Sequence, residues 1–78
     1  MSKVYQELVN ATNELLGPAS ERFIDRQINN HLNIAPEELT AKDVGRLAEW
    51  ISLSISMLTD DTETLRAYNL ALRKLSKE

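Results

Sequence analysis

The sequence predicts an all-α fold, a small four-helix bundle made of three long helices and a short helix or turn. Only two glycines and two prolines interrupt the 78 residues, and all but Gly45 fall where a helix would begin or end. The first two stretches between these breaks, residues 1–16 and 19–35, have a length that suits helices and exceeds that of typical strands. Apolar residues recur every three or four positions within them, the period of an amphipathic helix. We therefore expect one helical domain spanning residues 1–78.

The first helix is expected to follow Ser2 and to end at Leu16. The Ser2 hydroxyl suits an N-cap, because it can accept a hydrogen bond from a backbone N–H of the first turn. Gly17 and Pro18 end the helix, since glycine adopts the left-handed conformation and proline cannot continue the hydrogen-bond ladder. The apolar side of this helix consists of Met1, Val4, Leu8, Ala11 and Leu15.

The second helix is expected over roughly residues 19–32, with Pro18 near its first turn, where the missing N–H costs little. Asn33 is the expected C-terminal cap, because asparagine tolerates the left-handed conformation. The apolar side of this helix consists of Ala19, Phe23, Ile24, Ile28 and Leu32.

A short connection is expected to lead into the third helix. Pro36, followed by two acidic residues, is typical of the first turn of a short helix. On either side of it, Ile34 and Leu39 are expected to fold back onto the core. Thr40 and Asp43 have the spacing of a capping box, with Asp in place of the usual Glu or Gln.

The third helix, expected over residues 41–58, is apolar on two adjacent sides. At about 100° per residue, one broad side consists of Val44, Leu47, Ala48, Ile51, Ile55 and Leu58. A second apolar sector beside it consists of Trp50, Leu53 and Met57. Only a narrow remainder is left for water: Gly45, Glu49, Ser52 and Ser56. A helix at the edge of a core needs a narrower stripe, so this helix is expected to be central to the bundle or shared with another chain.

The fourth helix is expected to begin after Asp60 and Asp61, because carboxylates stabilise a helix N-terminus. Its apolar positions again recur every three or four residues, at Leu65, Tyr68, Leu72 and Leu75. Basic residues complement the helix dipole at its C-terminal end: Arg73, Lys74 and Lys77.

The composition excludes several kinds of chemistry. The chain has no cysteine and a single histidine, His31, so disulfides and a zinc site of thiolates or clustered imidazoles within one chain are impossible. The isolated Gly17 and Gly45 do not make a phosphate-binding loop. His31 has no identifiable partner acid or nucleophile, so we interpret it as a surface or capping residue. We expect no metal, no cofactor and no enzymatic activity.

Length, acidity and the four-helix pattern are similar to those of acyl carrier proteins. That family attaches its prosthetic arm to the serine of an Asp-Ser-Leu motif at the start of its second helix. This motif is absent here, where Ser52, Ser54 and Ser56 lie inside the third predicted helix. The carrier function is therefore not expected.

Location and partners follow from the same composition. No run approaches the roughly 20 apolar residues of a membrane span, so we expect no membrane contact. No apolar segment follows a basic start at the N-terminus, so we expect no signal peptide and a cytoplasmic protein. The net charge of −3 disfavours broad attraction to nucleic acid. A single core in so short a chain gives only marginal stability. Since disulfides and a metal site are excluded, association with another chain is the remaining source of additional stability.

The leading hypothesis is a non-enzymatic helical protein–protein interaction module that associates with itself, as a homo-oligomer, or with another helical protein. The expected interface residues are Trp50, Leu53, Met57 and Tyr68.

The alternative is a small helix-turn-helix-like DNA-binding regulator. Its second helix would contact phosphates through Arg22 and Arg26, which are four residues apart. Glu21 and Asp25 alternate with these arginines, which favours a solvated face of mixed charge instead.

Overall fold

The computed structural model describes residues 2–77 and confirms the all-helical class, with no strand among those residues. The elements are α1 (Lys3–Leu16), η1 (Gly17–Ala19), α2 (Ser20–His31), η2 (Pro36–Glu38), α3 (Ala41–Ser56) and α4 (Thr62–Leu75), where η1 and η2 are single 3-10 turns. Met1, which was assigned to the apolar side of the first helix, lies outside the described residues.

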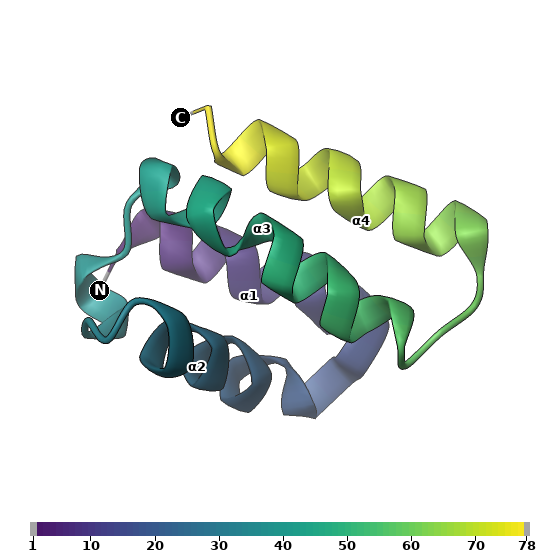
Figure 1. Cartoon of the computed structure of the whole chain (residues 1–78), viewed down its shortest axis with the longest axis horizontal. Helices are drawn as coiled ribbons and strands as arrows, with labels where there is room; N and C mark the ends of the chain where they lie inside the picture. Colours follow the sequence, from purple (N-terminus) through teal and green to yellow (C-terminus); the bar gives the residue numbers. More distant parts are fainter. Residues whose placement is uncertain (1, 78) are drawn as a thin grey trace.

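Helices that follow one another in the chain pack side by side, and the last helix also packs against the first. Helix α1 contacts α2 and α4, and α3 also contacts α2 and α4. In the view of Figure 1, α3 lies in front of α1, with α2 below and α4 above. Each helix therefore has two helical neighbours and keeps one side that no other helix covers.

Local hydrogen bonds fix most of the helix ends where the sequence predicts them. Gly17 and Asn33 have positive φ values of 59° and 53° just after the ends of α1 and α2, and at Gly17 the ψ of −133° is one that favours glycine. Asp43 N–H donates to Thr40 Oγ1 at 3.3 Å and Thr40 N–H donates to Asp43 Oδ2 at 3.1 Å, which confirms the capping box. Asp61 accepts from the backbone N–H of Thr64 at 3.3 Å and caps α4.

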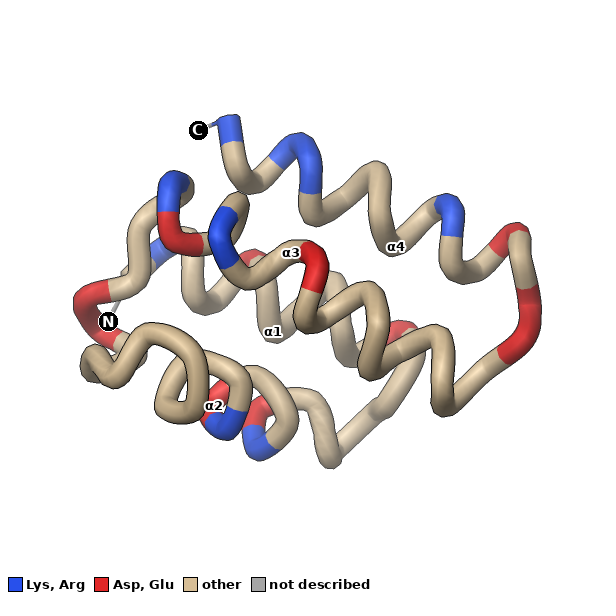
Figure 2. The backbone as a smooth tube through the Cα atoms, in the orientation of Figure 1, with Lys and Arg blue, Asp and Glu red and all other residues tan. Residues whose placement is uncertain are grey.

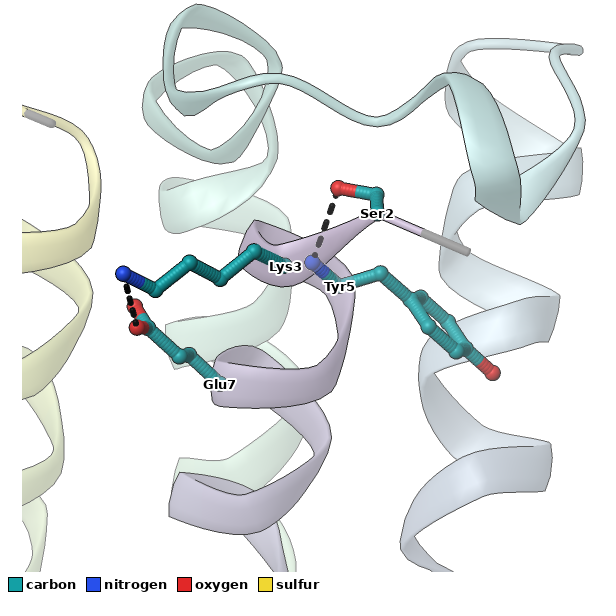
Figure 3. A network of polar contacts seen from close by, with 4 residues as sticks. All are labelled: Ser2, Lys3, Tyr5 and Glu7. Carbon is teal, nitrogen blue, oxygen red and sulfur yellow. Dashed lines mark hydrogen bonds and ion pairs between the residues drawn. The ribbon is translucent and has the colours of Figure 1, made fainter.

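The N-terminus of α1 is fixed in the same way and is also tied to a distant segment. Tyr5 N–H donates to Ser2 Oγ at 3.2 Å, and Lys3 pairs with Glu7 one turn further on at 4.0 Å (Figure 3). The Ser2 hydroxyl in turn donates to the carbonyl of Leu39 at 2.7 Å. Leu39 is buried, so the connection before α3 folds back onto the core as expected.

The core side of α3 is fully enclosed. Its core-facing residues Val44, Leu47, Ile51 and Ile55 have no exposed surface. They lie about 40° to either side of a common direction on the helix. This single side of α3 therefore faces the core of the bundle.

Helix α3 ends two residues earlier than predicted. The N–H groups of Met57 and Leu58 donate to carbonyls three residues back, at 3.2 and 2.9 Å, so the α-helical period no longer applies to them. Leu58, which the periodicity assigned to the core side, is 62% exposed. This assignment was wrong because it extended the 100° rotation past the end of the helix.

Candidate interaction surface

Most of the exposed large apolar side chains gather on one helix and the turn that ends it. Trp50, Leu53 and Met57 are 49%, 58% and 80% exposed, and all three belong to α3 or to the turn that ends it. The spacing of three residues places Trp50 and Leu53 within an arc of about 60° on the side away from the core, and Met57 follows in the turn that ends the helix. We call these three residues the outer stripe of α3.

Charged residues border the outer stripe but do not enter it. No charged residue occurs between Trp50 and Thr59. Figure 2 accordingly shows no red or blue segment on α3 beyond the red one near its middle. Arg46 precedes the stripe by one turn and lies in the same arc, whereas Asp60 follows it in the loop to α4. The surface is thus apolar in the middle and oppositely charged at its two ends.

A stacked pair of rings holds the tryptophan of this stripe. The rings of His31 and Trp50 are 4.4 Å apart between centroids and only 10° from parallel. His31 is the last residue of α2, and the contact lies beside a bond from Gln27 Nε2 to Ser54 Oγ at 3.4 Å, so α2 and α3 run antiparallel here. Stacking restricts the indole to one orientation, which lowers the entropy that a binding partner would otherwise have to remove.

Sequence reasoning missed this role of His31. The residue was interpreted as a surface or capping residue, and it is indeed exposed. Its partner comes from the following helix, and no spacing within either helix indicates that the two rings meet. Only the packing of α2 against α3 brings them together.

Tyr68 does not belong to the outer stripe, although the sequence grouped it with these residues. Its side chain is 4% exposed, and its hydroxyl lies 2.7 Å from Thr12 Oγ1. Thr12 uses its own proton to donate to the carbonyl of Leu8 at 2.8 Å. Tyr68 therefore donates to Thr12, and burial raises the pKa of the Tyr68 phenol to about 12. The residue joins α4 to α1 in the core and is not accessible to a partner.

The small polar side of α3, which was expected to face water, lies beside α4. Ser52 Oγ donates to Asn69 Oδ1 at 2.5 Å, and a Cβ on Gly45 would lie 3.5 Å from that of Ser76. A shallow groove of about 610 Å³ remains between the two helices, lined in part by Ser56. Small side chains allow α4 to approach closely, whereas the bulky stripe that includes Trp50 would hold it away. Gly45, Glu49 and Ser56 are exposed as expected, and Ser52 is partly covered by α4.

The two arginines of the DNA-binding alternative stand among carboxylates. Arg22 and Arg26 are exposed on α2, and Arg22 borders a depression together with Glu21 and Asp25. Figure 2 shows red and blue alternating on this helix. Asp25 also accepts a hydrogen bond from the Tyr5 hydroxyl at 2.5 Å, so its carboxylate has a structural role. This arrangement favours a solvated surface of mixed charge over a phosphate-binding one.

Other kinds of site find no support in the part of the chain that the structure describes. No three His, Cys, Asp or Glu residues between positions 2 and 77 lie together as ligands for a metal ion. No helix in the same range has the length and apolar character needed to cross a membrane. Comparison with protein-family models, curated proteins and solved structures found no match.

Proposed function

We propose that this chain is a non-enzymatic helical interaction module that associates with a second copy of itself through the outer stripe of α3. One observation carries the proposal: three large apolar side chains are exposed on a single, charge-free side of one helix. Single exposed apolar residues are common on soluble proteins. A contiguous group is less common and marks surfaces that bind another molecule.

Trp50 supports this interpretation by its chemistry and by its fixed position. Tryptophan is among the residues most enriched where interface substitutions cost most. Here about half of the indole is exposed, and the rest is held by the ring of His31. An apolar group that is already ordered loses little freedom on binding, so it contributes more of its burial energy to association.

Charge and size favour a second copy as the partner. A two-fold interface brings the same surface of each copy together, so a net charge of −3 would oppose a dimer if the acids lay within the contact. The outer stripe avoids this repulsion because it contains no charge. A standard interface covers about 800 Å² per partner, which is about a sixth of the 5167 Å² of accessible surface. One side of α3 and its neighbours can supply this area.

The test is the mass of the protein in solution, measured by sedimentation equilibrium over a range of concentrations. We expect twice the 8.9 kDa chain mass for the unmodified protein and the single-chain mass for Trp50→Glu, with unchanged helical circular dichroism. Leu70→Glu is the matched control, because Leu70 is exposed to the same degree but lies on α4. An unmodified protein that stays monomeric at millimolar concentration would overturn the proposal, and so would a Trp50→Glu variant that keeps the dimer mass.

A further inference from the structure

We propose that the two copies meet with their α3 helices antiparallel, related by a two-fold axis that passes beside Leu53. This inference rests on the proposed self-association and specifies its geometry. It follows from the order of charged and apolar residues along the exposed side of α3.

The charges at the two ends of the outer stripe have opposite signs: Arg46 lies within α3 before the stripe, and Asp60 lies in the loop just after α3 ends. Arg46 precedes Leu53 by seven residues (53 − 46) and Asp60 follows it by seven (60 − 53). Both are exposed, and neither forms an ion pair within residues 2–77. In an antiparallel pair about this axis, Arg46 lies at the end of the contact where the loop that carries Asp60 of the partner subunit begins, so the two charges attract. In a parallel pair it would lie opposite a second Arg46, and like charges would repel.

The apolar residues of the stripe fit the same axis. Trp50 and Met57 lie three and four residues from Leu53, so in the antiparallel pair Trp50 lies opposite Met57 of the partner subunit. Methionine is flexible and its sulfur makes favourable contacts with aromatic rings. The more exposed, adaptable side chain would therefore pack against the rigid indole that His31 holds. A two-fold axis gives this contact twice in each dimer.

Engineered disulfides distinguish the two orientations, because the chain contains no cysteine of its own. A disulfide requires Cα atoms about 4.4–6.8 Å apart, and a helix rises about 1.5 Å per residue. We expect Leu53→Cys to form an intersubunit disulfide, since the two copies of residue 53 meet at the axis. We expect Arg46→Cys not to cross-link with itself, since its two copies lie about 20 Å apart along the helices. A mixture of Arg46→Cys and Asp60→Cys is expected to give the mixed dimer.

Charge reversal tests the end contacts without a covalent bond. We expect Arg46→Glu and Asp60→Lys each to raise the dimer dissociation constant about tenfold, because each change replaces two attractions per dimer with two repulsions. Combining the two substitutions in one chain is expected to restore the dissociation constant to within about threefold of its original value. Arg22→Glu is the matched control, which makes the same charge change on α2 and leaves the dissociation constant unchanged.

The outcomes separate this inference from the proposed function. A dimer that dissociates on Trp50→Glu, but in which Leu53→Cys forms no disulfide or Arg46→Cys cross-links with itself, overturns the antiparallel geometry alone. Failure of the combined charge reversal to restore association also overturns it. A monomeric unmodified protein overturns both.

Discussion

Neighbouring residues of α3 provide the most direct test of the structure on which these proposals rest. Ile51 has no exposed surface, whereas the side chain of Trp50 is 49% exposed. Tryptophan is the larger residue, and where both are buried its truncation to alanine costs at least as much as that of isoleucine. The structure predicts the opposite order: Ile51→Ala is expected to destabilise the protein more than Trp50→Ala.

The expected magnitudes differ by about a factor of two. Replacing a fully buried isoleucine by alanine costs about 2–5 kcal/mol, because the removed methyl groups leave a cavity. Trp50 loses only its half-buried area and its stacking on His31, about 1–2 kcal/mol. A domain of this length has a total free energy of unfolding of about 4–12 kcal/mol, so both variants are expected to fold and to differ measurably.

The assay is urea unfolding followed by circular dichroism, since Trp50→Ala removes the only tryptophan. Association raises apparent stability, so the comparison is made at a concentration low enough that dilution no longer moves the midpoint. Under those conditions, a larger loss of stability for Trp50→Ala than for Ile51→Ala would refute the orientation of α3 and, with it, the outer stripe.

Three further predictions concern bonds elsewhere in the fold. Thr12→Val is expected to lower the free energy of unfolding by about 1–3 kcal/mol, because it leaves the buried Tyr68 hydroxyl without an acceptor. Tyr68→Phe removes that hydroxyl and is expected to cost only about 0.5–1.5 kcal/mol. Urea midpoints in the reverse order would contradict Tyr68 as the donor. Burial raises the pKa of Tyr68 to about 12 and also raises that of Tyr5, whose hydroxyl donates to a carboxylate. A raised phenol pKa means that the unfolded chain ionises first, so stability is complete below pH 10 and is lost as pH rises above it. Phenolate absorbance near 295 nm is therefore expected to appear only together with the loss of helical dichroism, and its growth in the folded protein near pH 10 would contradict the prediction. Thr40→Ala is expected to cost about 1 kcal/mol in thermal or urea unfolding, whereas Thr40→Ser keeps the cap to Asp43 and loses less; equal losses would argue against the capping box.

Much of the fold could be predicted from the sequence because the interactions that limit each helix are local. The caps at Ser2, Gly17, Asn33 and Thr40 involve atoms only a few residues apart, so a short stretch of sequence contains both partners. The core side of α3 was equally predictable, since Val44 and its partners recur with the helical period. The period failed at Leu58, where the helix had already ended.

The candidate interaction surface was only half determined by the sequence. The helical period places Trp50 and Leu53 on one side of α3 and Ser52 on another, and in the structure Trp50, Leu53 and Met57 are exposed. The period does not determine which neighbouring helix covers which side. That choice depended on side-chain volume, because the small residues beside Ser52 admit α4 closely and the bulky stripe does not.

Two assignments therefore needed the tertiary structure. Tyr68 lies in the core because α1 provides an acceptor for its hydroxyl in Thr12, far away in the chain. Trp50 lies at the surface because α4 packs on the other side of α3, and it is held there by His31 from α2. By itself the sequence determined that α3 has more apolar surface than one core needs. Only the packing of the other helices decided which part of that surface remains exposed, since contacts between helices depend on shape across the interface and not on the period within one helix.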